Sequence, residues 1–286
     1  MKYRNPTLPE GINTSKTHPL REFLLLSLGA LALISILVVT LGYFGGQLSR
    51  WLVSIETENE WAERWMEPYE DNETPPPLRS YLDSIGDKMQ VALTLPEGMR
   101  IHLIYNNDDT VNAYATLGGR ITLYRGLLEK IPHENALAML IAHEIAHVES
   151  RDPIVSIGSS VGILTALSLL LSSTDISPLQ ETGLLTQLAF SRDMEEDADT
   201  AALQAVADVY GHVSGADGLF RIIQAEHSGN DSDEPPAFLS THPLDEKRIE
   251  AIKHIAHKKG WRLDLPTTPL PAQFKAWINS PSVPQP

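Results

Sequence analysis

Two histidines and a glutamate lie close together near the middle of the chain, in the stretch His143-Glu144-Ile145-Ala146-His147. Residues four apart fall on the same face of a helix, so the two imidazoles can bind one metal ion. Glu144 lies about 100° further around the helix, where it can reach a water molecule at that ion. The pattern predicts a zinc site with one position open for water and with Glu144 as general base.

Coincidence is the alternative, because a chain with this content of histidine and glutamate contains the pattern by chance in roughly a few per cent of cases. Good helix formers fill Asn135–Glu149, with Pro132 shortly before the run and Pro153 after it. One helix is therefore predicted to position all three side chains. A buried helix that carried these polar groups without a partner would be unstable, which favours the metal site.

The third ligand is predicted on a second helix, within Ser191–Leu203. Glu195 and Asp199 are four residues apart and share one face of that helix. One carboxylate can bind the metal while the other accepts a hydrogen bond from a ligating imidazole and fixes its orientation. A solvated acidic face is the alternative for such a run. The acidic run lies about fifty residues after the histidine helix, which favours a metal ligand over a solvated face.

Composition limits the classes of function. The formal net charge is −15, which argues against a nucleic-acid partner. The chain contains no cysteine, so a zinc ion must be held by histidine and carboxylate. Its 286 residues leave room for one sizeable domain with extensions, and they leave the oligomeric state undefined.

An uncharged run of 22 residues, Phe23–Phe44, is long enough to cross a bilayer as a helix. A secretory signal peptide usually has a shorter apolar core and ends at a small-x-small site, for which Gly45-Gly46-Gln47 is a poor match. A buried core helix is the other alternative, and the absence of any charge argues against it. An uncleaved membrane anchor is therefore predicted.

The charges beside this anchor predict its orientation. Residues 1–22 contain four Lys and Arg, whereas residues 45–66 contain two. Basic residues stay on the cytoplasmic side, so the N-terminus is predicted in the cytoplasm. The catalytic domain is then predicted in the periplasm of a bacterium, tethered by a single pass to the inner membrane.

The chain is predicted to be an α+β protein, mainly α-helical, with a small sheet of three strands before the metal helix. Strand patterns occur in Arg100–Tyr105, Val111–Ala115 and Arg120–Tyr124, and the last two flank a turn at Leu117-Gly118-Gly119. The predicted divisions are an N-terminal cytoplasmic tail (1–22), the anchor (23–44), an acidic linker (45–77), the domain that carries the zinc site (78–265) and a Pro-rich C-terminal tail (266–286).

Ile154–Leu171 is a second uncharged run. If it crossed the membrane, Glu195 would lie on the opposite side from His143, and residues 176–190 are too short for a convincing return crossing. It is therefore predicted to be a buried or membrane-leaning helix of the domain.

The chain resembles the membrane-associated zinc metallopeptidases that include the HtpX heat-shock protease and the CAAX prenyl protease. Four matches carry the resemblance: Asn112-Ala-Tyr-Ala with Gly119 and Gly126-Leu127; His143-Glu-Ile-Ala-His147; Ser191-Arg192 with Glu195 and Ala198-Asp199; and Thr241-His242-Pro243 with Arg248-Ile249. They span roughly residues 80–260 in this order. The resemblance implies that residues 78–265 form a zincin-like zinc metallopeptidase domain with one zinc ion per chain.

The resemblance also implies roles for individual residues. It makes Glu195, not Glu196, the third zinc ligand, and places His242 and Arg248 near the site as potential donors to an oxyanion. Asp197 stands where the family usually has Glu or Gln.

Substrate binding is predicted at the strand of Asn112, Ala113 and Tyr114, which can pair with an extended peptide through its backbone. HtpX-like members carry several spans, so this chain looks closer to single-anchor or periplasmic members, whose substrates are often misfolded or misassembled envelope proteins. The alternatives are a catalytically silent zinc-binding scaffold or chaperone-like factor, and, among enzymes, a prenyl-protein protease.

Overall fold

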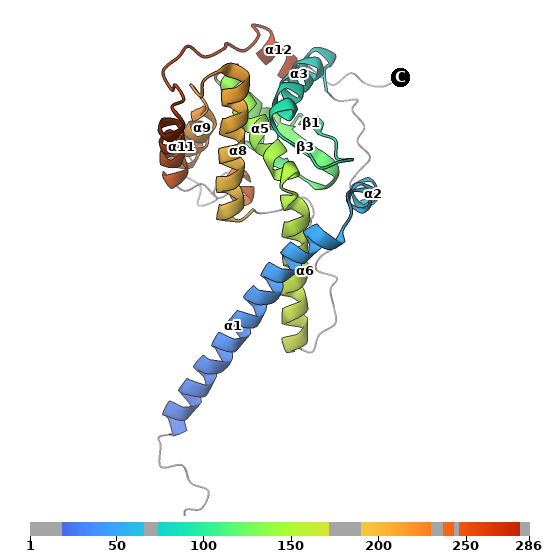
Figure 1. Ribbon diagram of the computed structural model, residues 1–286, viewed down its shortest axis with the longest axis vertical. Coiled ribbons are helices and arrows are strands. Elements are labelled where there is room, and N and C mark those ends of the chain that lie inside the picture. Colours follow the sequence, from blue (N-terminus) through green and yellow to red (C-terminus); the bar gives the residue numbers. More distant parts are fainter. Residues whose placement is uncertain (1–18, 66–73, 172–189, 230–236, 243–245, 281–286) are drawn as a thin grey trace, which may run out of the picture.

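The computed structural model describes residues 19–65, 74–171, 190–229, 237–242 and 246–280. In this part of the chain helices dominate, and three short strands form one sheet. A globular part carries one long helix that projects away from it (Figure 1). The predicted fold class is confirmed.

The projecting helix is α1, Pro19–Leu52, and it contains the predicted anchor. Its large apolar side chains are exposed along its length. Among the described residues, it is the helix that is long and apolar enough to cross a membrane. Residues 1–18 of the predicted cytoplasmic tail lie outside the described residues.

The region 45–77 was predicted to be an acidic linker, and the structure differs. Residues 45–52 complete α1, and a separate helix α2 follows at Ile55–Trp65. Ala62 and Glu58 on α2 are buried, since this face packs against the turn η1, Leu117–Gly119. The acidic side chains therefore mark the outer face of a docked helix, except for Glu58.

The proline cluster at the end of this region begins helix α3, Pro76–Ala92. Proline suits the first turn of a helix, because the N–H that it lacks would have no partner there. Leu78, Leu82 and Ile85 of this helix are buried in the core.

Helix α6, Asp152–Leu171, packs antiparallel against α1 and projects from the globular part beside it (Figure 1). A Cβ atom at Gly45 would lie 2.5 Å from the backbone oxygen of Gly158, so the two backbones touch where side chains would keep them apart. Val161 and Ile163 of α6 are exposed. Helix α6 therefore packs on α1 and projects from the globular part, whereas its first turn, with Ile154 and Val155, is buried.

The sheet contains β1 (His102–Asn106), β2 (Ala113–Ala115) and β3 (Arg120–Tyr124), in the order β1-β3-β2. Strands β2 and β3 pair antiparallel, as predicted for the hairpin, and β1 pairs parallel with β3. Gly118 and Gly119 both have φ of 69°, a conformation that suits glycine in this turn. Strand β2 therefore forms one edge of the sheet.

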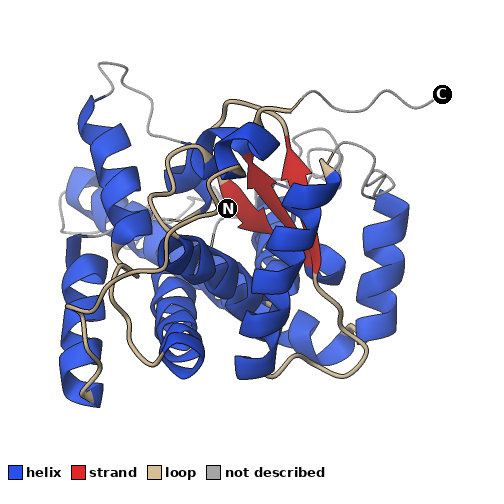
Figure 2. Ribbon diagram, turned by 90° about the horizontal axis from the view of Figure 1, so that it is seen from above, coloured by secondary structure: helices blue, strands red, loops and turns tan. Residues whose placement is uncertain are grey.

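Helix α5, Glu134–Glu149, runs through the centre of the globular part and is buried along nearly its whole length. It packs against α3 and α8 (Arg192–Tyr210), as Figure 1 shows, and against β2. Figure 2 shows the strands of the small sheet lying among the helices. The other helices are α4 (Arg125–Leu128), α9 (Gly218–Gly229), α10 (Ala237–Thr241), α11 (Glu246–Lys259) and α12 (Phe274–Ile278). The core thus forms around α5, which carries the predicted metal-binding residues.

The segment 266–286 was predicted to be a Pro-rich tail outside the domain, but its described part, up to residue 280, packs onto the domain. Phe274 and Ile278 of α12 are fully buried. The backbone of Glu134 donates to the carbonyl of Thr268 at 2.9 Å, so this segment covers the start of α5. Apolar residues at helical spacing between the prolines account for the difference.

Candidate metal centre

Helix α5 presents His143 and His147 on one face, as the four-residue spacing predicted. Both imidazoles are fully buried. Their Nε2 atoms lie 3.1 Å apart, and the ring centroids are separated by 4.7 Å. Two nitrogen donors therefore converge on one point in the interior.

Helix α8 brings Glu195 to the same point. The hydroxyl of Ser191 caps the helix by accepting from the backbone of Met194 at 3.3 Å. The Glu195 carboxylate is fully buried and lies 3.4 Å from Nε2 of both His143 and His147. Glu196 points to solvent. The structure thus places Glu195 with the histidines and Glu196 away from them.

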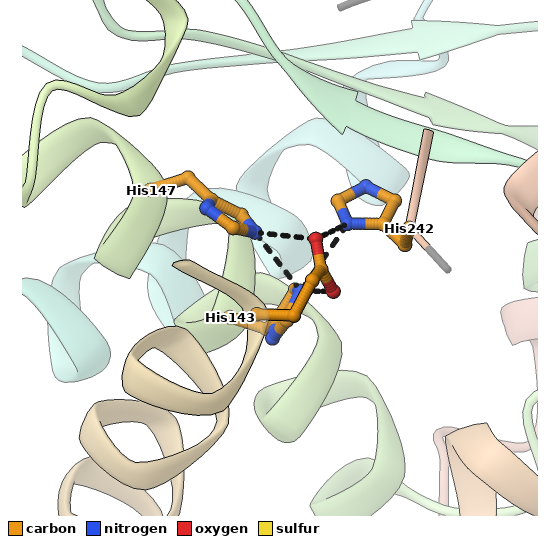
Figure 3. A group of neighbouring side chains, drawn as sticks. His143, His147 and His242 are labelled. Carbon is orange, nitrogen blue, oxygen red and sulfur yellow. Dashed lines mark hydrogen bonds and ion pairs between the residues drawn. The ribbon is translucent and has the colours of Figure 1, made fainter. Parts of the chain in front are cut away.

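His242 follows α10 and completes the group. Its Nδ1 lies 2.8 Å from Oε1 of Glu195 and 3.4 Å from Nε2 of His143. Figure 3 shows the three imidazoles converging. Donor atoms of His143, His147, Glu195 and His242 all lie within 4.8 Å of one another. Sequence reasoning placed His242 near the site but did not foresee a fourth donor within the cluster.

A buried arginine holds the carboxylates of this cluster. Nε and Nη2 of Arg248 contact the two oxygens of Asp199 at 2.7 and 2.8 Å, and Nη1 contacts Oε2 of Glu195 at 2.7 Å. Asp199 in turn lies 3.0 Å from Nδ1 of His143. The structure thus brings Asp199 and Arg248 to the site as predicted. The guanidinium is engaged by carboxylates, so the donor role considered for Arg248 does not fit this geometry.

Asp152 holds His147 from the other side. Its Oδ2 lies 2.9 Å from Nδ1 of His147, and Phe190 stacks on the same imidazole with ring centroids 4.0 Å apart. Sequence reasoning missed both residues. The available signal for Asp152 was an acidic residue five positions after the second histidine, at the start of the next helix.

Glu144 is fully buried, and neither of its carboxylate oxygens has a hydrogen-bond partner in the described part of the chain. Nε2 of His242 lies 3.5 Å from Oε1. Burial of a carboxylate without hydrogen bonds is costly, so a residue in this state indicates a place where a ligand or water is received.

The electrostatics of the cluster suit a cation. Burial lowers the pKa of His143, but the carboxylates of Asp199 and Glu195 outweigh it and raise that pKa to about 10. Burial raises the pKa of Glu195, but the His242, His143 and His147 imidazoles hold it well below its usual range. A divalent ion would supply the positive charge in place of protons, because ligating imidazoles are neutral. Nitrogen and oxygen donors are those that zinc takes.

The predicted substrate strand lies beside this cluster. Ala113 and Ala115 of β2 are buried, and Tyr114 is half-buried. The hydroxyl of Thr241, next to His242, lies 3.5 Å from Oδ1 of Asn112. The edge of the sheet and the cluster are thus neighbours.

Comparison with known proteins identifies the family. The model of peptidase family M48 matches residues 77–256. The Beta-barrel assembly-enhancing protease of Escherichia coli K12 is 28% identical over 203 residues, which cover 64% of this chain and 40% of that protein. The mitochondrial metalloendopeptidase OMA1 of Schizosaccharomyces pombe is also 28% identical over 203 residues, covering 69% and 57%. The OMA1 of Arabidopsis thaliana is 29% identical over 168 residues, covering 58% and 33%.

This chain therefore spans only about 40% to 57% of the length of the first two relatives. The family match nevertheless covers more than half of the chain itself and confirms the resemblance inferred from the four motifs. The chain belongs to peptidase family M48.

Proposed function

We propose that this protein is a membrane-anchored zinc metalloendopeptidase that hydrolyses peptide bonds in other proteins. The observation that carries the proposal is the buried cluster of His143, His147 and Glu195 beside Glu144, a buried carboxylate without a hydrogen-bond partner. Membership of peptidase family M48 supports it. A silent scaffold would have no need to keep a carboxylate unpartnered at such a place.

In this proposal, His143, His147 and Glu195 hold one zinc ion per chain. When bound, the ion supplies Lewis acidity, which polarises the scissile carbonyl and makes a water molecule more acidic. Glu144 accepts the proton of the attacking water and passes it to the leaving amine, because its oxygens are the free acceptors beside the cluster. Asp199 and Arg248 keep His143 and Glu195 in place.

His242 is proposed as the donor that stabilises the charge developing on the carbonyl oxygen. Its buried Nε2 lies 3.5 Å from Oε1 of Glu144 and has no hydrogen-bond partner in the described residues. Because Nδ1 already faces the carboxylate of Glu195 at 2.8 Å, Nε2 donates to the carbonyl oxygen when the ring carries a proton on both nitrogens. The alternative is a fourth ligand, which would fill the position that a catalytic zinc site keeps open. His242→Ala distinguishes the two: reduced turnover with unchanged metal content supports the donor, whereas reduced metal content supports the ligand.

Substrates are proposed to bind as an extended strand along Asn112, Ala113 and Tyr114. Because β2 forms an edge of the sheet, a peptide can add to it through backbone hydrogen bonds. Recognition through the backbone tolerates many sequences, which suits a protease that acts on locally unfolded proteins.

Helices α1 and α6 support a proposal for the membrane arrangement. We propose that α1 crosses the bacterial inner membrane once, with the N-terminus in the cytoplasm and the catalytic domain in the periplasm. His143 precedes α6 and Glu195 follows it, yet the two lie in one cluster, which supports an α6 that leans into the bilayer and does not cross it. His147 lies only five residues before α6, so the site faces proteins near the membrane surface.

Misfolded or misassembled envelope proteins are the proposed substrates. A Glu144→Gln variant that keeps its metal should retain bound substrates, because the base is missing while the binding groups remain. Captured proteins, identified by mass spectrometry, should be enriched in envelope proteins relative to a matched Glu149→Gln variant of the same helix. Equal capture by both variants would contradict the proposal.

Protease treatment of spheroplasts tests the orientation. The domain should be digested from outside while a tag at residue 1 survives. Digestion of the domain only after lysis would show that the chain is inserted the other way round.

A further inference from the structure

The junction between α5 and α6 connects the membrane anchor to the metal cluster. Asp152, the first residue of α6, is buried with its carboxylate between two partners. Its Oδ2 lies 2.9 Å from Nδ1 of His147, and its Oδ1 lies 3.3 Å from Nη2 of Arg50, in the last turn of α1. A continuous set of polar contacts therefore runs from α1 to an imidazole of the cluster.

The contact with Asp152 determines which nitrogen of His147 carries the proton. Nε2 of His147 faces the cluster, 3.1 Å from Nε2 of His143, so Nε2 must be unprotonated to bind a metal ion. The proton of the neutral ring then lies on Nδ1, and the Asp152 carboxylate accepts it. Phe190 stacks on the ring and limits its rotation, but an apolar ring does not select the tautomer.

The end of α1 is fastened to the same junction. Arg151 donates to the backbone carbonyls of Arg50 and Val53, each at 2.9 Å, and pairs with buried Glu58 at 2.6 Å. Arg151 adopts φ of 55°, which is uncommon for a residue with a side chain and persists where surrounding contacts enforce it. These contacts fix where Arg50 stands relative to Asp152.

The close packing of α1 on α6 also fixes the position of Arg50, through contacts further along the two helices. The hydroxyl of Ser49 donates to the carbonyl of Ile154 at 2.8 Å, one turn nearer the globular part than the contact between Gly45 and Gly158. Glycines at such a contact allow two helices to approach closely within a bilayer. The position of Arg50 is therefore set by how α1 docks on α6.

We propose that Asp152 is a positioning residue for His147, and that the membrane anchor holds Asp152 in place through Arg50. The inference rests on the proposed metal site. It makes the affinity of that site dependent on the docking of α1, so release of the anchor from α6 weakens metal binding.

A purely structural role is the competing explanation. A carboxylate in the first turn of α6 stabilises that helix through its dipole, and Arg50 is partly exposed, so the pair alone contributes little. Under this explanation, substitution of Asp152 lowers thermal stability and leaves the affinity for metal unchanged.

The test uses the full-length protein in detergent micelles. Zn²⁺ affinity is measured by competition with a chromophoric chelator, and the visible spectrum of the Co²⁺-loaded protein reports the geometry of the ligands. In Asp152→Asn, the amide offers one acceptor oxygen and an NH₂ group, so it cannot accept from both His147 and Arg50 on separate atoms. We expect Zn²⁺ affinity to fall about 10- to 100-fold with a changed Co²⁺ spectrum.

Further variants distinguish the positioning role of Asp152 from a purely structural one. Asp152→Glu, which keeps the carboxylate, should lose less affinity than Asp152→Asn. Arg50→Gln should lose roughly two- to fivefold, since one exposed ion pair is removed. The double variant Arg50→Gln/Asp152→Asn should be no weaker than Asp152→Asn alone, because Arg50 acts through Asp152.

Two matched controls should bind Zn²⁺ as the unmodified protein does. Asp193→Asn removes an exposed carboxylate from the first turn of α8. Arg64→Gln removes an exposed positive charge from α2, which follows the last turn of α1, where Arg50 lies. Unchanged affinity and Co²⁺ spectrum in Asp152→Asn would overturn the inference, as would fully additive losses in the double variant. An unmodified protein that binds no Zn²⁺ would instead refute the proposed function itself.

Discussion

Arg248 offers a quantitative test of how the centre is held together. Its guanidinium contacts Asp199 through Nε and Nη2 and Glu195 through Nη1, all within 2.8 Å, and the side chain is buried. Substitution by methionine preserves much of the apolar volume but leaves two buried carboxylates without this cation. Removal of one partner from a buried ion pair destabilises a protein by about 3–5 kcal/mol.

The expected effect is large enough for calorimetry. For a domain of this size, about 1 kcal/mol corresponds to roughly 2–4 °C in Tm, so Arg248→Met should lower Tm by about 6–20 °C. The measurement uses metal-free protein in chelator, because a bound cation would partly compensate for the lost charge. The Tm of Arg248→Lys, which keeps the charge without the forked geometry, should fall between the Tm of the unmodified protein and that of Arg248→Met.

A surface pair provides the matched control. Arg221 contacts Asp217 at 2.7 Å, but its side chain is 68% exposed. Arg221→Met should therefore cost no more than about 1 kcal/mol. If Arg248→Met and Arg221→Met lowered Tm equally, the buried guanidinium would not have the stabilising role assigned to it.

The stability difference should also depend on pH. Burial raises the pKa of Asp199, but His143 and Arg248 outweigh it and hold that pKa below its ordinary value of 3.8. A lowered pKa in the folded state contributes stability above the ordinary value and loses it as pH falls through the lowered value. The deficit of Arg248→Met should therefore be full at neutral pH and shrink below about pH 4. A constant deficit down to low pH would contradict this explanation.

Two further predictions concern the ligand set and the helix pair. Glu195→Ala should lose most of its bound zinc, whereas Glu196→Ala should keep it, as measured by metal analysis after gel filtration; the reverse result would refute the ligand assignment. Gly158→Val should separate α1 from α6, because a Cβ atom there would lie 2.6 Å from the backbone oxygen of Gly45. Faster hydrogen exchange in α6 should report this, whereas Gly29→Val, at a position with open space, should change nothing there.

Part of the site could be predicted because its geometry is local. His143, Glu144 and His147 lie on one helix, and helical periodicity alone fixes their relative directions. Glu195 and Asp199 obey the same rule on a second helix. Their pairing with the histidines is a tertiary contact, which the position of the acidic run after the histidine helix suggested and the resemblance to known metallopeptidases supported.

The remaining site residues depend on long-range packing. His242 enters the cluster because α10 packs against β2 and the residue after α10 reaches Glu195 of α8 and His143 of α5, and no local pattern describes that return. Asp152 follows the left-handed turn at Arg151, which points its carboxylate back toward His147. Sequence periodicity gives no information about a reversal of this kind.

The division of the chain was less predictable than its elements. Acidic residues of α2 suggested a solvated linker, although the face of Glu58 and Ala62 is buried. Hydropathy predicted helix α6 but gave no indication that it packs against α1. The recurrence of glycine four residues apart, at Gly158 and Gly162, was a signal for close helix packing that the hydropathy of the run concealed.

The central claim is that Glu144 acts as the base of a metal-dependent peptidase, and Glu144→Gln tests it most directly. Zinc content and cleavage of an unfolded protein such as casein are measured on the same preparation, with Glu149→Gln as the control on the same helix. We expect one zinc ion per chain in both variants and turnover reduced about 10²- to 10⁴-fold only in Glu144→Gln. Near-normal cleavage by zinc-loaded Glu144→Gln would contradict this claim.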